Sequence, residues 1–152
     1  MNTLFFEDLK VGDAWTSDQL PVNYEDMLAY NRKYDPWPFH ADEAAGKESL
    51  FGSVIASGGY TVSLAFQSVH NVFNNADTRL AFIAGFDWRL KFENPVKPGD
   101  VLSNRFTVLA KKESTKAGRG IVTFHEQLRN QKQQNVLEIE AICLIATRPS
   151  AQ

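Results

Sequence analysis

The feature of this sequence with the clearest chemical use is the pairing of Asp35 with His40 on a proline-stiffened segment. Residues 34–42 read Tyr-Asp-Pro-Trp-Pro-Phe-His-Ala-Asp. Proline lacks a backbone N–H and disfavours helix in the residue before it, so Pro36 and Pro38 predict an extended, stiff loop up to His40. A carboxylate and an imidazole held this close can act as an acid/base pair. The alternative is that Asp35 only begins a turn and His40 only caps the next helix.

A second candidate site lies at the start of a long apolar segment. Residues 51–61 read Phe-Gly-Ser-Val-Ile-Ala-Ser-Gly-Gly-Tyr-Thr, and Ser57 is suited to cap a helix that begins at Gly58. The free N–H groups and the positive end of such a helix would stabilise a carbonyl oxygen that becomes negative during a reaction. The alternative is that Gly58 and Gly59 serve only close packing.

The elements that would position these residues follow from the hydrophobic periodicity. Asn23 and the acids after it predict a helix that ends near Tyr34, and residues 58–73 are apolar on nearly every side of a second helix. From Gly85 the period changes to two, which predicts strands at residues 86–93, 101–110, 120–129 and 136–147. Because the connections are short, these strands must be antiparallel. The sequence therefore predicts an α+β fold in which a curved antiparallel sheet wraps around a long central helix.

Length and composition limit the possible classes of protein. A chain of 152 residues, 43% hydrophobic and 22% charged, is typical of one globular domain, so residues 1–152 are expected to form a single domain. A net charge of −2 argues against a nucleic-acid partner, and no apolar run is long enough to suggest a membrane partner. The single cysteine, Cys143, reads as a core thiol and favours a cytoplasmic location. His40, His70 and His125 lack the spacing of a zinc site, so no metal is expected.

The two candidate segments together resemble the MaoC-like dehydratases and (R)-specific enoyl-CoA hydratases, a family of hotdog fold. The family motif is Asp-x-Asn-Pro-apolar-His, followed by an acidic residue, by Phe-Gly, and by small residues that lead into Gly and the central helix. The matching segments here are Asp-Pro-Trp-Pro-Phe-His at 35–40, Asp42, Phe-Gly at 51–52 and Ile-Ala-Ser-Gly at 55–58. Residues 6–13 and 90–100 also look like the family's, so the resemblance spans most of the chain.

The resemblance implies an enzyme that interconverts trans-2-enoyl thioesters and (R)-3-hydroxyacyl thioesters. In the family, the residues that match Asp35 and His40 hold and activate one water, which adds to the β-carbon while a proton is delivered to the α-carbon. The residue that matches Gly58, next to Ser57, gives its N–H to the thioester oxygen, and Ser63 falls where the family often has a serine. No cofactor is implied, because coenzyme A or acyl carrier protein is part of the substrate.

Trp37 departs from the motif, since it stands where the family has asparagine. A large ring replaces an amide that could order the loop, and we expect Trp37 and Phe39 to contribute to the acyl pocket. Two alternatives therefore stay open beside the hydratase. One is a hotdog acyl-CoA thioesterase, in which a carboxylate directs water at the thioester carbonyl. The other is a non-catalytic acyl-thioester-binding domain in which Trp37 blocks turnover.

The predicted strands also indicate self-association. An apolar face made by Phe86, Trp88, Leu90 and Phe92 can cover one helix, whereas Ile142 and Leu144 lie on the opposite phase of the last strand. A second apolar surface suggests a second partner, and two-fold dimers are the commonest closed assemblies. We therefore expect a homodimer or a higher homo-oligomer.

Overall fold

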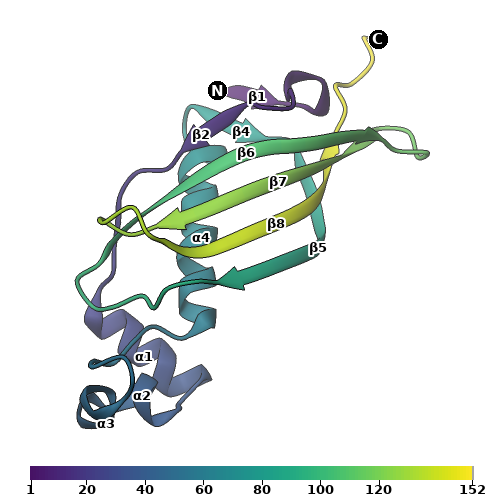
Figure 1. The fold of residues 1–152 in the computed structure, drawn as a ribbon. Helices are drawn as coiled ribbons and strands as arrows, with labels where there is room; N and C mark the ends of the chain where they lie inside the picture. Colours follow the sequence, from purple (N-terminus) through teal and green to yellow (C-terminus); the bar gives the residue numbers. More distant parts are fainter. Residues whose placement is uncertain (152) are drawn as a thin grey trace.

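The helix at Gly58–Phe73, α4, lies in the hollow of a curved sheet (Figure 1). The computed structural model describes residues 1–151. The other helical elements are a 3-10 turn at Phe6–Asp8, α1 at Tyr24–Tyr34, α2 at Pro38–Ala41 and α3 at Glu43–Glu48. The strands are β1 (Asn2–Leu4), β2 (Ala14–Thr16), β3 (Leu20–Pro21), β4 (Thr78–Leu80), β5 (Phe82–Phe92), β6 (Val101–Glu113), β7 (Arg119–Arg129) and β8 (Asn135–Ala146).

The main sheet has the strand order β2-β6-β7-β8-β5, and every pairing within it is antiparallel. Strand β3 also pairs with β6, while β1 and β4 form a separate parallel pair. The sheet does not close into a barrel, so β5 lies at one edge. The predicted α+β fold, with a curved antiparallel sheet around a long central helix, is confirmed.

Polar caps fix the starts of the helices that the sequence predicted. The Asn23 side chain accepts a hydrogen bond from the Asp26 N–H at 3.0 Å, and the Ser57 hydroxyl accepts one from the Tyr60 N–H at 3.2 Å. Each bond satisfies an N–H that has no partner within its own helix. The predicted starts of α1 and α4 are therefore confirmed.

The expectation of an extended loop up to His40 is wrong in its second half. The segment is extended only to Trp37, and Pro38 is the first residue of α2. Proline suits a first helical position because its fixed φ matches the helix and its missing N–H would have had no partner there. The proline that was expected to prevent helix therefore begins one.

The apolar face of β5 is less covered than the sequence suggested. The Trp88 ring lies 5.1 Å from the ring of Phe66 on α4, which shows that this face turns toward the helix. Yet Phe86, Trp88, Leu90 and Phe92 are 38 to 56% exposed. Because β5 is an edge strand, no strand among residues 1–151 pairs with its outer side.

Candidate active site

Asp35 and His40 face each other at the junction between α1 and α2. Asp35 caps the C-terminus of α1, where its N–H donates to the Asn31 carbonyl at 2.9 Å, and His40 lies in α2. Asp35 Oδ2 lies 3.8 Å from His40 Nε2. The Asp35 side chain is 42% exposed, whereas that of His40 is 9% exposed. A gap of 3.8 Å is too long for a direct hydrogen bond, so a water can contact both atoms.

The hydrogen bond on the other side of the His40 ring determines which nitrogen can act as a base. His40 Nδ1 lies 2.8 Å from the Ile55 carbonyl oxygen. A carbonyl oxygen can only accept, so Nδ1 must carry the proton of the neutral ring. The lone pair is therefore on Nε2, the atom that faces Asp35. This is the tautomer that a general base at this place requires.

Asn31, which was not among the predicted site residues, connects the acid/base pair with the start of α4. Its side chain is completely buried. Asn31 Nδ2 donates to the carbonyls of His40 and Ile55 at 3.0 and 3.1 Å, and its Oδ1 accepts from the Ser57 N–H at 3.0 Å. One amide thus joins three separate backbone segments. The sequence does contain a signal for Asn31. It follows Met27 by four residues and Leu28 by three, which places a polar side chain on the buried apolar face of α1.

The first turn of α4 combines available N–H groups with close approaches of aromatic rings. Ser57 is fully buried and serves as the cap, so its hydroxyl is engaged with the Tyr60 N–H. A Cβ on Gly58 would lie 3.1 Å from the Phe92 ring, and a Cβ on Gly59 would lie 2.6 Å from the Tyr30 hydroxyl. Gly59 is therefore required for close packing, while Gly58 offers its N–H beside the Phe92 ring.

The remaining predicted site residues lie around this junction in different environments. Phe39 is half-buried, and its ring centre is 4.4 Å from that of His40. Trp37 is 61% exposed. The Ser63 hydroxyl donates to the Gly59 carbonyl at 2.9 Å, one turn back along α4. Phe39 thus packs beside the imidazole, the Trp37 side chain is largely open to solvent, and the Ser63 hydroxyl is engaged in a bond within its own helix.

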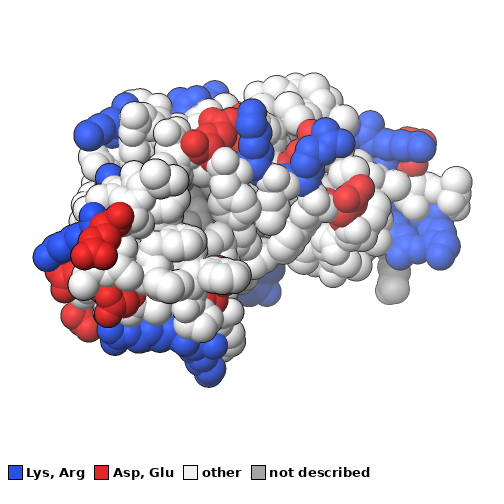
Figure 2. Space-filling view, turned by 60° about the horizontal axis from the view of Figure 1, so that its bottom comes forward, with Lys and Arg blue, Asp and Glu red and all other residues white. Residues whose placement is uncertain are grey.

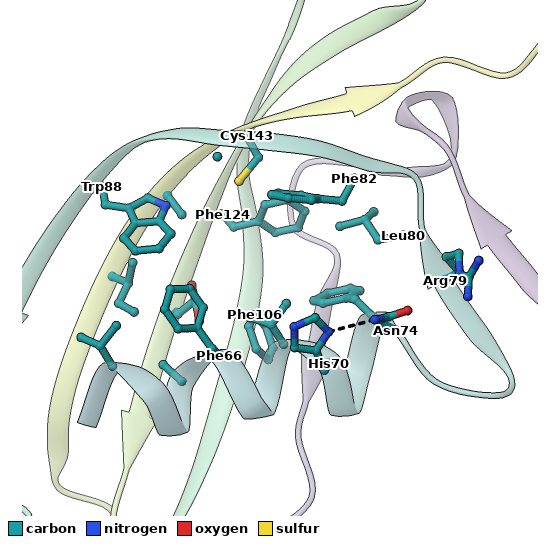
Figure 3. A pocket seen from close by; sticks show the side chains of 18 residues that line it. Phe66, His70, Asn74, Arg79, Leu80, Phe82, Trp88, Phe106, Phe124 and Cys143 are labelled. Atoms are coloured by element: carbon teal, nitrogen blue, oxygen red, sulfur yellow. Dashed lines mark hydrogen bonds between the residues drawn. The ribbon is translucent and has the colours of Figure 1, made fainter. Parts of the chain in front are cut away.

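A cavity of about 470 Å³ extends between α4 and the hollow face of the sheet (Figure 3). This volume is within the usual range for small-molecule pockets. Phe66 on α4 faces Trp88, while Phe106, Phe124 and Cys143 come from the sheet. Asp35, His40 and Gly58 do not line this cavity; its wall residue Val62 lies about one turn further along α4 than Gly58.

Two titratable groups in the cavity wall have pKa values well above their usual ones. Burial raises the pKa of the Cys143 thiol to about 11, so it is a protonated core thiol at neutral pH, consistent with the sequence prediction. Burial also raises the pKa of Glu126 to about 7. Glu126 is only 7% exposed, and it was not among the predicted site residues. Its signal was a charged residue on the same strand phase as Val122, Phe124 and Leu128.

The free energy of unfolding of the original protein is expected to fall between about pH 5 and pH 7, and Glu126→Gln is expected to abolish this fall. The folded pKa lies above the usual 4.5, so in this range the native state retains a proton that the unfolded chain has released. The free energy of unfolding of the original protein should therefore fall as the pH rises, by at most about 3 kcal/mol, and level off above pH 7. Urea titrations of both proteins at pH 5, 6, 7 and 8 measure this difference. Identical pH profiles for the two proteins would contradict the expectation.

Comparison with known proteins places the chain in a family. Residues 10–129 match the family described as the MaoC like domain. The uncharacterized protein YdeM of Bacillus subtilis is 29% identical over 141 residues, which cover 91% of this chain and 96% of that protein. The structure of the MaoC-like dehydratase from Rhodospirillum rubrum is 34% identical, with a TM-score of 0.86 over 97% of this chain and 99% of that one.

More distant structures share the fold. The unliganded R-hydratase PhaJ1 of Pseudomonas aeruginosa has a TM-score of 0.73 at 22% identity, over 97% of this chain and 92% of that one. Solved neighbours also include a Mycobacterium tuberculosis protein described as a double hotdog fold, with a TM-score of 0.80 over 99% of this chain and 46% of that one. Within residues 1–151, no helix is long and apolar enough to cross a membrane. The family match covers most of the sequence, and the chain therefore belongs to the MaoC-like dehydratase family, whose domains have the hotdog fold.

Proposed function

We propose that this protein is a hydro-lyase that interconverts trans-2-enoyl thioesters and (R)-3-hydroxyacyl thioesters of coenzyme A or acyl carrier protein. The observation that carries the proposal is the bond from His40 Nδ1 to the Ile55 carbonyl, because it leaves the Nε2 lone pair facing Asp35. The similarity to a MaoC-like dehydratase supports the same class of reaction. Figure 2 shows that charged side chains lie mostly around the middle of the molecular face turned forward there.

In the hydration direction, one water would lie between Asp35 Oδ2 and His40 Nε2. The pair takes a proton from this water as its oxygen bonds to the β-carbon, and a proton is delivered to the α-carbon, so that the elements of water are added across the double bond. Negative charge develops on the thioester oxygen during this addition. The Gly58 N–H, at the positive end of α4, would stabilise that charge. The proposed step uses no metal and no redox cofactor.

A hydration assay over trans-2-enoyl-CoAs of graded chain length tests the proposal. The loss of enoyl absorbance measures turnover, and chiral analysis of the product distinguishes the (R) from the (S) alcohol. Formation of the (R)-3-hydroxyacyl-CoA is expected. Release of free thiol from saturated acyl-CoA, without hydration, would favour the thioesterase instead. Binding of acyl-CoA by calorimetry, with neither reaction, would favour the binding domain.

Replacing Trp37 by alanine is expected to change the preference among acyl chains more than the chemistry. The indole has no acid or base function at neutral pH, and its exposure of 61% means that it is not wedged between Asp35 and His40. Each methylene gained or lost in a pocket changes discrimination by about 1–3 kcal/mol. The ratios of kcat/KM over short, long and branched enoyl-CoAs measure the effect. An equal loss on every chain would instead mean that Trp37 supports the loop.

We further propose that the protein forms a homodimer through the edge strand β5. Hotdog domains commonly form homodimers. Strand β5 has unpaired backbone groups along one side, and Phe82, Ile83 and Phe86 on it are 47 to 56% exposed. Exposed apolar edge strands invite pairing with another chain. A second copy offers the same strand, which is what a two-fold interface needs.

Phe86→Lys is therefore expected to convert the dimer into a monomer. A lysine on an apolar edge strand opposes pairing because its charge would have to be buried. Light scattering at micromolar concentration measures the mass. Leu109→Lys is the matched control, since Leu109 is also on a strand and 43% exposed but lies on β6, away from this edge. A monomeric mass for the original protein would overturn the proposal.

We also propose that residues 1–152 act as one domain in the cytoplasm. Within the described chain, the Arg148 guanidinium bonds the Asp8 carboxylate, which joins the two ends. Strands β2 and β3 likewise attach the N-terminal segment to β6. The single cysteine supports a reducing compartment.

A further inference from the structure

The buried carboxyl group of Glu126 has no part in the proposed reaction, although it lines the cavity beside α4. Glu126 projects from β7 between its register partners Phe106 on β6 and Ile139 on β8, and both of these also line the cavity. Most of the cavity wall is apolar, including Phe66 on α4 and Trp88 on β5, although His70, Asn74 and Arg79 also line it. A carboxyl group in such surroundings is costly unless its oxygens have hydrogen-bond partners.

Hydrogen bonds within the protein engage only one of the two oxygens of the Glu126 carboxyl. Glu126 Oε1 accepts a hydrogen bond from Asn104 Nδ2 at 2.9 Å. For Glu126 Oε2, no hydrogen-bond partner exists among residues 1–151. Asn104 is completely buried, and its Oδ1 also lacks a partner within the described chain. A network built only for stability would be expected to satisfy its members.

Asn104 is held in place without Glu126. Its Nδ2 also donates to the Ser68 hydroxyl at 2.9 Å, and its backbone N–H donates to the Ser17 hydroxyl at 2.9 Å. Glu126 adds one hydrogen bond to a residue that two other bonds already hold. Its Oε2 takes no part in that bond and is available to a molecule in the cavity.

The shared contacts of Asn104 also locate Glu126 along the cavity. Asn104 bonds both Ser68 and Glu126, so the carboxyl lies level with Ser68 on α4. Ser68 is ten residues after Gly58, which corresponds to about 15 Å along the helix axis at 1.5 Å per residue. A thioester held at Gly58 would therefore bring only the distal part of its acyl chain to Glu126.

We propose that Glu126 selects acyl chains that carry a hydroxyl group on their distal part. This inference rests on the proposed function, because it takes the cavity as the acyl-binding end of the same site. The apolar body of the chain would pack against Phe66, Phe106 and Trp88, and the hydroxyl would bond Glu126 Oε2. A hydroxyl both donates and accepts, so it pairs with the carboxyl whether or not that group is ionised. A second carboxylate would be repelled by the ionised form, and an ammonium would form a buried ion pair that is costly to desolvate.

Calorimetric titration with two saturated thioesters tests this selectivity without any need for turnover. The probes are dodecanoyl-CoA and 12-hydroxydodecanoyl-CoA, which differ only in the terminal hydroxyl. The original protein should bind the hydroxylated chain more tightly, and Glu126→Leu should reduce that preference about tenfold, the equivalent of about 1.4 kcal/mol for one lost hydrogen bond. Glu126→Gln keeps the volume and a hydrogen-bonding group, so it should retain most of the preference.

Ile139→Val is the matched control, because Ile139 lies beside Glu126 on the neighbouring strand β8, lines the same cavity and is apolar. It should change the affinities of both thioesters by the same factor. An equal change of both affinities in Glu126→Leu would overturn the inference. The inference would also be overturned if the original protein showed no preference between the two thioesters. This measurement does not depend on the folding of any variant.

The enoyl-CoA hydration assay separates this inference from the proposed function. Hydration without a Glu126-dependent preference for the hydroxylated chain would leave the hydratase standing and overturn the selectivity. A Glu126-dependent preference without hydration of any enoyl-CoA would support the selectivity and count against the hydratase.

Discussion

Asp35→Asn and His40→Gln are each expected to lower kcat for enoyl-CoA hydration by about 10²–10⁴-fold, the usual contribution of a general acid/base group. Asp35 Oδ2 and His40 Nε2 lie 3.8 Å apart, so one water held between them depends on both. Removing either group removes the same activated water. The double variant should therefore lose little more than either single variant, as is found for residues that act as a unit.

Glu43→Gln is the matched control for these variants. Glu43 is a carboxylate on the neighbouring helix α3, and its side chain is 66% exposed. It should leave kcat nearly unchanged. Circular dichroism and thermal unfolding check that each variant keeps its fold. Full activity in either Asp35→Asn or His40→Gln, with the fold intact, would exclude the acid/base pair.

Asn31→Asp is expected to cause the largest loss of stability among single substitutions of similar size, by about 3 kcal/mol or more. The substitution keeps the shape of the side chain but replaces the Nδ2 donor with an oxygen. That oxygen would face the carbonyls of His40 and Ile55, which only accept hydrogen bonds. The result is a buried negative charge beside two carbonyl dipoles in place of two hydrogen bonds.

The substitution should also lower the catalytic rate, because Asn31 is a positioning residue for His40. We expect kcat to fall in Asn31→Asp even at temperatures where the variant stays folded, with a smaller change in KM. Asn94→Asp is the control, since the exposed Asn94 amide also donates to a carbonyl, that of Asn135. Urea titration should show that Asn94→Asp lowers the free energy of unfolding by less than about 1 kcal/mol. Equal stability losses in the two variants would contradict a special role for Asn31.

Local sequence signals were sufficient to predict the helices and long strands that position the candidate site. The caps at Asn23 and Ser57 act through atoms within three residues, so their helices could be predicted from neighbouring residues alone. The long strands show alternation over ten residues or more, which local periodicity detects. The strands β1 to β4 span only two or three residues each and were missed, because so short a segment has no measurable period.

The sequence by itself determined the α+β fold, the long central helix, the family resemblance and the choice of Asp35 and His40. These depend on residue types, on spacing and on contacts between near neighbours. It did not determine the tautomer of His40, which depends on Ile55, 15 residues away. Nor did it reveal that Asn31 joins three segments, since its partners lie 9 to 26 residues along the chain.

Only the tertiary structure decided which apolar and polar side chains are buried. The apolar face of β5 looked like core, yet it is partly exposed because that strand lies at the sheet edge. Glu126 carries a charge-bearing side chain, yet it is buried because β7 has paired neighbours on both sides and α4 across its hollow face. Which strand lies at the sheet edge, and which side chains the helix covers, are set by packing among distant segments. Local periodicity identifies an apolar or a polar face but not what packs against it.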